Sequence, residues 1–156
     1  MGRMITVSFP MTAATVAQDI LAVKAGTARG FRLHYVSVFQ NTEFGDAAAE
    51  MIDVTIMKGV GDTPGSGGTA LTIGKHNSSD AADAFAIELG GNTTLATGGT
   101  ISTLWPDSFH VAAGWYWLPP PSMIQEFAIS ETFLLRLGAP DDSTAFGAMA
   151  VIEELG

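Results

Sequence analysis

The segment at residues 30–41, GFRLHYVSVFQN, carries the clearest structural signal in the chain. Phe31, Leu33 and Tyr35 alternate with the polar residues Arg32 and His34, which is the period of a half-buried β-strand. Aromatic and β-branched residues fill the rest of the segment and favour the same structure. We therefore predict a strand with Phe31, Leu33 and Tyr35 on one face.

The same period of two recurs on both sides of this segment. Ile5, Val7 and Phe9 predict a first strand, which we expect Pro10 to end. Residues 51–59, MIDVTIMKG, predict another strand. The stretch MTAATVAQDILAVKAG is ambiguous, because its alanines favour a helix while Leu-Ala-Val before a glycine favours a short strand. The stretch NTEFGDAAAE is too short and too broken by glycine to predict a substantial helix.

The rest of the chain divides into segments of five to eleven residues, most of them bounded by Gly, Pro, Asn or Asp. Together they predict about nine or ten short strands with turns every 8–12 residues, a spacing typical of a β-sandwich or barrel. No repeat and no domain boundary is evident. We predict an all-β fold: one antiparallel β-sandwich domain over residues 1–156, with its strands in jelly-roll order.

Composition limits the classes of partner. Only 15% of the residues are charged, against about 25% in an average domain. A surface with so few charged residues is typical of a protein that binds other proteins. A small β-protein that is simply rich in Ala and Thr would have the same low fraction of charged residues. The net charge of −9, with no cluster of Lys or Arg, argues against binding nucleic acid or an anionic membrane. No apolar run is long enough to span a membrane, and no signal peptide is expected.

The glycine run GSGGTA at residues 65–70 matches the dinucleotide-binding pattern G-x-G-x-x-A. Such a site needs a helix directly after the glycines, because the helix N-terminus binds the pyrophosphate. The residues that follow, LTIG, are β-branched and end in glycine. The run is therefore predicted to connect two strands, and no cofactor is expected.

No combination of residues predicts catalysis or metal binding. His34, His76 and His110 are well separated and form no H-x-H or H-x-x-x-H pair, and the chain has no Cys. Paired acids such as Asp141 and Asp142 could bind calcium or hydrolyse glycosides. Their place after Pro140 favours solvated turn residues instead. The protein is expected to be no enzyme and to lack catalytic, cofactor and metal sites.

The block WPDSFHVAAGWYWLPPP at residues 105–121 has the most unusual composition. Alternation places Trp115 and Trp117 on one face of a strand and Tyr116 on the other. The tryptophans could fill the core, form a subunit interface or offer a platform for a ligand, and these alternatives stay open. The following prolines cannot pair in a sheet and predict a stiff edge that could lie against a neighbouring subunit.

Several segments together resemble a group of small proteins encoded in tailed-phage and prophage genomes. The shared features are a Gln followed by a short polar stretch and Gly-Asp, Gly-Ser-Gly-Gly, Asn-Thr-Thr-x-Ala, Gly-Trp before a proline-rich turn, Ala-Pro-x-Asp, and Glu-Glu-x-Gly. They occur here in FQNTEFGDAAAEMIDVTIMKG, GSGGTALT, NTTLATGGT, GWYWLPPP and LLRLGAPDDSTAFGAMAVIEELG. The resemblance covers most of the chain.

The resemblance implies a virion structural protein, made in the bacterial cytoplasm and located on the capsid surface. Within that class it favours a capsid decoration, or cement, protein that binds the major capsid protein and itself, often as a trimer. The alternative is a carbohydrate- or receptor-binding β-sandwich of a fibre. The candidate contact residues lie in the N-terminal strand, the glycine-rich loop and the aromatic block: Ile5, Phe9, Pro64, Trp115, Trp117, Pro119, Pro120 and Pro121.

Overall fold

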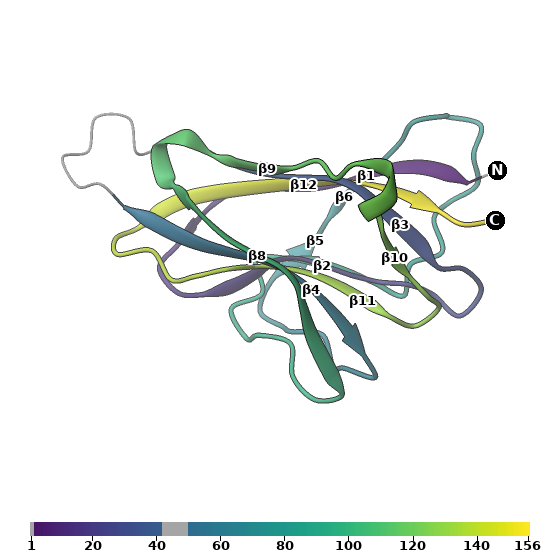
Figure 1. The fold of residues 1–156 in the computed structure, drawn as a ribbon, viewed down its shortest axis with the longest axis horizontal. Helices are drawn as coiled ribbons and strands as arrows, with labels where there is room; N and C mark the ends of the chain where they lie inside the picture. The colour runs from purple at the N-terminus through teal and green to yellow at the C-terminus, as the bar shows by residue number, and fades with distance from the viewer. Residues whose placement is uncertain (1, 42–49) are drawn as a thin grey trace.

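Two antiparallel β-sheets of six strands each pack face to face in the computed structural model, which describes residues 2–41 and 50–156 (Figure 1). Sheet A has the order β10-β3-β12-β1-β6, and β9 pairs with β3 beside β10. Sheet B has the order β5-β7-β2-β11-β4-β8. The prediction of an all-β antiparallel sandwich is confirmed.

The strands are short to medium in length, and two 3₁₀ turns are the helical elements of the described residues. The first 3₁₀ turn, η1, covers Val111–Ala113, and the second, η2, covers Pro121–Met123. Among the described residues, no helix has the length and hydropathy that crossing a membrane requires. The strand bounds are β1 Arg3–Ala14, β2 Gln18–Lys24, β3 Phe31–Gln40, β4 Met51–Val60, β5 Thr69–Ala70, β6 Thr72–Lys75, β7 Ile87–Gly90, β8 Thr100–His110, β9 Trp115–Trp117, β10 Gln125–Phe127, β11 Thr132–Leu137 and β12 Thr144–Glu154.

The strand pairs are nested from the ends of the chain toward its middle. β1 pairs with β12, β2 with β11, β3 with β9 and β10, and β4 with β8, all antiparallel. Successive pairs lie alternately in sheet A and sheet B. The two halves of the chain therefore run side by side as one long antiparallel pair that passes back and forth between the sheets. That is the jelly-roll order, with β5, β6 and β7 added at the opposite sheet edges.

The core lies between the sheets and is built by alternation along each strand. On β1 and β12 the register places Ile5 opposite Ile152, Val7 opposite Ala150, and Phe9 opposite Ala148. All of these side chains are buried, while the residues between them face outward. Small residues on β12 leave room for the larger side chains of its neighbours, as close packing of a sandwich requires.

Two details of the predicted strands are wrong. Pro10 does not end the first strand, because β1 continues to Ala14 after an irregularity between Phe9 and Thr12, where a proline removes no regular ladder bond. Tyr35 does not share the face of Phe31 and Leu33. A register shift between Val151 and Ile152 on β12 moves Val36 into the core and leaves Tyr35 half-buried.

The ambiguous stretch after Pro10 contains strand β2, and the expectation for NTEFGDAAAE falls largely on residues 42–49, outside the described residues.

A buried ion pair holds a loop against the outer surface of sheet B. The carboxylate of Asp19, which is fully buried, accepts hydrogen bonds from Arg136 Nε at 2.7 Å and from the backbone N–H of Ala96 at 2.8 Å. Ala96 packs with Ala22 and Leu134 in a second apolar cluster beneath this loop. The ion pair therefore explains why β2 and β11 are buried on both faces.

Replacing Asp19 by Ala should destabilise the fold by about 3–5 kcal/mol, because Arg136 loses its carboxylate and the Ala96 N–H loses its acceptor. Urea unfolding of the wild type, Asp19→Ala, and the double variant Asp19→Ala/Arg136→Met measures this loss. The double variant removes both charges and should recover part of the stability. Equal stability of Asp19→Ala and the wild type would show that the ion pair does not hold the loop.

Candidate interaction surfaces

Four of the predicted contact residues belong to the core. The exposed fraction is 1% for Ile5, 3% for Phe9, 9% for Trp115 and 6% for Trp117. Alternation placed each pair on one face correctly, but that face is the inner face of sheet A. The prediction of a contact role for these side chains gives way to the core alternative, since the sandwich itself covers them.

The tryptophans close one long edge of the sandwich. Trp117 packs against Trp105 of β8 with ring centroids 6.5 Å apart. The indole N–H of Trp115 donates to Asp107 Oδ2 at 3.0 Å. This bond, with further donors from the Ser108 backbone and Trp105, lowers the pKa of Asp107. The ionised carboxylate of Asp107 is thus the acceptor that holds the indole ring of Trp115 in place at this edge of the sandwich.

The opposite face of β9 is exposed. Tyr116 retains 70% of its surface and Leu118 retains 68%, the two highest values among the exposed large hydrophobic residues of the described chain. β9 pairs with β3 in a register that places Tyr116 opposite Ser37. Alternation in GWYWL had already separated Tyr116 from the tryptophans, but nothing in the sequence showed which of the two faces meets solvent.

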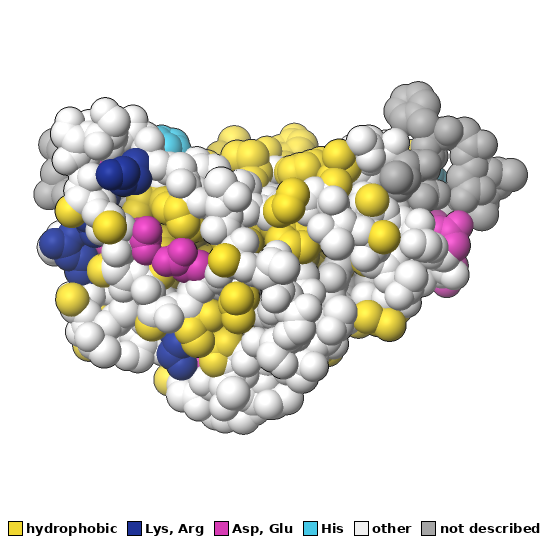
Figure 2. All heavy atoms as spheres, turned by 180° about the vertical axis from the view of Figure 1, so that it is seen from behind, with side chains coloured by type: hydrophobic (Ala, Val, Ile, Leu, Met, Phe, Trp, Pro, Cys, Tyr) yellow, Lys and Arg dark blue, Asp and Glu magenta, His cyan; other side chains and the backbone are white. Residues whose placement is uncertain are grey.

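Tyr116 begins a row of side chains that crosses the outer face of sheet A. The register continues from Ser37 on β3 to Met149 on β12, Ser8 on β1 and Thr72 on β6. In the next row, Tyr35 lies opposite Val151, which lies opposite Thr6. Figure 2 shows hydrophobic side chains gathered along the upper rim of the molecule, where sheet A faces outward.

A third row depends on a glycine. A Cβ atom on Gly147 of β12 would overlap the ring of Phe39 and press on Met11, so the absence of a side chain lets both residues lie across the strand. Phe39 and Met11 are each 40% exposed. The outer face of sheet A therefore carries large apolar side chains on β9 and β3 and, through Met11, on β1, beside small polar residues such as Ser8 and Thr72.

The proline run lies between the two short strands that pair with β3. Pro119 is half-buried, Pro120 and Pro121 are exposed, and Pro121 starts η2. The predicted stiff, unpaired edge is what the structure has. Prolines at the border of a sheet prevent further strands from pairing, so this edge is blunted.

The glycine-rich loop pairs with a second loop. Isolated bridges join Thr63 to Thr97 and Ser66 to Thr94. Pro64 is half-buried in this arrangement. Gly67 adopts φ +88°, which an L-residue tolerates poorly. The chain continues into β5 and β6, so the predicted connection between strands is confirmed.

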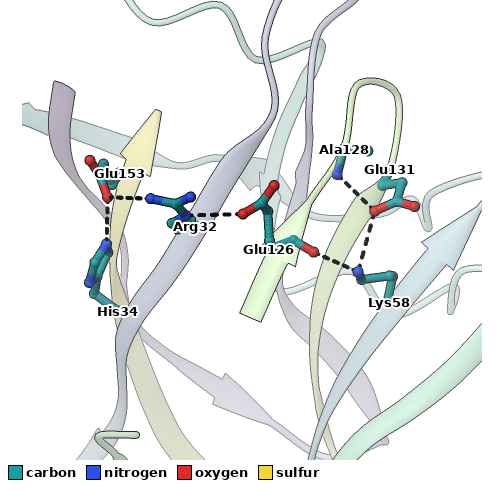
Figure 3. Close-up of polar contacts among 7 residues, drawn as sticks. All are labelled: Arg32, His34, Lys58, Glu126, Ala128, Glu131 and Glu153. Atoms are coloured by element: carbon teal, nitrogen blue, oxygen red, sulfur yellow. Dashed lines mark hydrogen bonds and ion pairs between the residues drawn. The ribbon is translucent and has the colours of Figure 1, made fainter. Parts of the chain in front are cut away.

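The basic side chains are all engaged within the chain. Arg32 contacts Glu126 at 3.0 Å and Glu153 at 4.0 Å, and His34 Nε2 lies 3.0 Å from the same Glu153 (Figure 3). Lys58 contacts Glu131 at 3.4 Å. The other five Lys and Arg residues also have partners: Arg3 and Arg29 contact Glu154, Arg136 contacts Asp19, and Lys24 and Lys75 donate to backbone carbonyls.

At one end of the sandwich, the described residues include no Lys or Arg. The turns and strand ends at residues 10–18, 50–54, 106–114 and 138–146 lie opposite the end that carries both termini (Figure 1). They contain Glu50, Asp53, Asp107, Asp141 and Asp142 but no Lys or Arg. We call this the acidic end.

The histidines do not converge. His34 contacts Glu153, His76 lies 2.8 Å from Thr6 Oγ1, and His110 accepts from the Ala112 N–H. Within residues 2–41 and 50–156, no group of three His, Cys, Asp or Glu residues could hold a metal ion.

The carboxyl group of Glu88 has a strongly shifted pKa. It lies opposite the buried Val23 in the β2–β7 pair, so its side chain turns toward the interior. Burial, and then the hydrogen bond and the charge of Asp83, raise the pKa of Glu88 to about 8. Glu88 therefore carries a proton at neutral pH.

Comparison of the chain with protein-family models, with curated proteins and with solved structures finds no match.

The raised pKa of Glu88 makes stability depend on pH. The folded state holds a proton between the ordinary pKa of 4.5 and about 8, whereas the unfolded state releases it. Stability should therefore be fully present at low pH and fall as the pH rises through this window, by roughly 1–3 kcal/mol after allowance for solvent screening.

Urea midpoints of the wild type and Glu88→Gln, compared between about pH 5 and pH 9, isolate this loss, because all other groups titrate in both proteins. The Gln variant should lose less stability over this range. Glu126→Gln, at an exposed position, serves as the matched control. Identical pH profiles for wild type and Glu88→Gln would contradict the assignment.

Proposed function

We propose that this chain is a structural protein of a tailed-phage virion, and specifically a decoration protein that binds the major capsid protein and stabilises the shell. The observation that carries this proposal is the exposed apolar outer face of sheet A, which Tyr116 and Leu118 dominate. Contiguous exposed apolar surface of this kind marks protein–protein contact.

Three further features support the proposal. The segment-by-segment resemblance to phage-encoded proteins covers most of the chain. The jelly-roll order gives a rigid frame, although the fold alone does not specify a function. The charged side chains are few, and the basic ones are already paired within the chain, so binding would rely on apolar and backbone contacts.

The fibre alternative depended on exposed tryptophans that stack on sugar rings. Trp115 and Trp117 face the core, and the aromatic edge is held by Asp107. The structure therefore gives no support to a tryptophan platform formed by these two residues.

A decoration protein stabilises the shell because it binds the assembled lattice and not the free subunits. Particles from a deletion strain should release their DNA at a lower temperature than wild-type particles. Adding back the purified protein should restore the wild-type temperature. The measurement is a thermal release assay with a dye that binds DNA.

Quantitative mass spectrometry of purified particles provides the control. A decoration protein should be present in a number comparable to the major capsid protein, and cryo-microscopy should show its density on the shell lattice. A copy number far below that of the capsid protein, or density confined to the tail, would refute the decoration role.

A further inference from the structure

The segment at residues 76–86 contains neither helix nor strand and crosses from β6 in sheet A to β7 in sheet B. We call it the strap. It lies over the end of the sandwich that carries both chain termini (Figure 1). Its first residues form a turn of their own, because Asn77 accepts from the N–H groups of Ser79 and Asp80. Residues 82–86 depend instead on contacts with other parts of the chain.

Hydrogen bonds tie the strap to the strands beneath it. The partners lie on β1, β12 and β2, so both sheets take part. The bonds join Arg3 Nη1 to the Ala82 carbonyl at 2.8 Å, the Ala84 N–H to Glu154 Oε1 at 2.7 Å, and the Ala86 N–H to the Lys24 carbonyl at 2.9 Å. Each of them is exchanged for a bond to water when the strap lifts, so each contributes little net stability.

Phe85 covers the core beneath the strap. Its ring meets that of Phe31 edge-on with centroids 5.6 Å apart, and Phe31 is fully buried. A Cβ atom on Gly26 would lie 1.9 Å from the Ala84 carbonyl oxygen, so the strap rests directly on the loop after β2. Lifting the strap would therefore bring Phe31 into contact with water.

Two carboxyl groups join the strap to β7. Asp83 is half-buried and hydrogen-bonds to Glu88, whose side chain turns toward the interior beside Val23. Ionised carboxylates only accept hydrogen bonds, so this bond requires a proton on one of the two groups. With the proton on Glu88, its hydroxyl donates to the Asp83 carboxylate and holds the strap closed. Without the proton, the two groups carry like charges and repel each other.

The groups packed around this pair do not replace the proton. β2 places Val23 opposite Glu88, and Leu71 donates its backbone N–H to the Glu88 carbonyl, so both of these neighbours are uncharged. The charged groups of the adjoining strands and of the strap have other partners within the described chain: Arg3 and Arg29 contact Glu154, Lys24 donates to the Asp62 carbonyl, Lys75 donates to the Asp80 carbonyl, and His76 contacts Thr6.

We propose that Asp83 and Glu88 form a proton-dependent latch, in which one shared proton holds residues 81–86 closed and its loss lets them lift while both sheets stay folded. The proton belongs to the pair, since strongly interacting groups titrate together. The latch goes beyond the proposed function, because it concerns a segment outside the outer face of sheet A and can be tested on the purified protein.

The direction of the pH effect follows from the raised pKa of Glu88. The closed strap keeps the proton up to about pH 8, whereas the lifted strap releases it above the ordinary pKa of 4.5. The equilibrium constant for lifting should therefore rise with pH through this window, by up to about tenfold per pH unit, and level off above it.

Hydrogen exchange of the backbone amides tests the latch, with each rate divided by that of an unstructured peptide at the same pH. The reporters are the amides of Ala84 and Ala86, which are bonded in the closed strap. Their protection should fall roughly tenfold or more between about pH 6 and pH 8. The Gly138 amide, which donates to Asp53 at the opposite end of the sandwich, should change much less.

Substitutions separate the acid pair from other causes. Glu88→Gln keeps a donor for Asp83 but cannot titrate, so the strap amides should stay protected throughout this pH range. Asp83→Asn removes the like charge and should weaken the pH dependence without abolishing it, because Glu88 remains partly buried. The matched control is Asp80→Asn, which removes a carboxylate from the same strap outside the pair and should keep the wild-type pH dependence. Circular dichroism should show the same fold for all variants.

Two kinds of result would overturn the latch. Strap amides that exchange as slowly as those of the central strand β12 at every pH would show that the strap opens only when the whole protein unfolds. Equal pH profiles for the wild type and Glu88→Gln, or loss of the pH dependence in Asp80→Asn, would show that the pair of Asp83 and Glu88 is not its cause. Binding to the shell is measured separately by the particle assays.

Discussion

The pairing of the two ends of the chain is the constraint on which the rest of the structure depends. β12 lies between β1 and β3 in sheet A, and β11 lies between β2 and β4 in sheet B. The last two strands of the chain therefore supply one central strand to each sheet. Neither sheet can close until these residues are in place, which makes the fold rich in contacts between distant parts of the chain and predicts slow folding.

The central position of β12 also explains its composition. The two middle inward positions of this strand are the small residues Ala148 and Ala150, which leave room for the side chains of both neighbouring strands, while the larger Phe146 and Ile152 lie toward its ends. Gly147 serves the outer face in the same way, because it lets Phe39 and Met11 meet above it. The small residues of one strand thus shape both the core and the exposed surface.

Much of the fold could be predicted from the sequence, because alternation and turn residues are local signals. The strands around Ile5, Phe31 and Ile52, and the connecting role of the glycine-rich loop, follow from such signals. The register shift that turns Tyr35 outward could not be predicted, since it depends on which residue of β12 lies opposite.

The candidate surface was harder to predict for a related reason. Alternation separates Trp115 and Trp117 from Tyr116, but it cannot say which side another sheet covers. Because exposed aromatic residues mark contacts, Trp115 and Trp117 were predicted as contact residues. In the structure the second sheet covers both tryptophans and leaves Tyr116 in solvent. The ion pair of Asp19 with Arg136 joins residues 117 positions apart, so no local sequence pattern could predict it.

The edges and charges of the sandwich restrict where it can bind. Prolines blunt the border of sheet A beside β9 and β10, while β5 and β6 have only two and four residues. β8 is the longest outermost strand of the described chain, and Pro106 interrupts its hydrogen-bonding potential. Strand addition is thus disfavoured at most borders, and the basic side chains already have partners inside the chain. Protected edges and paired cations leave the faces of the sandwich as the surfaces open to contact, and on the outer face of sheet A large apolar side chains such as Tyr116 and Phe39 meet solvent.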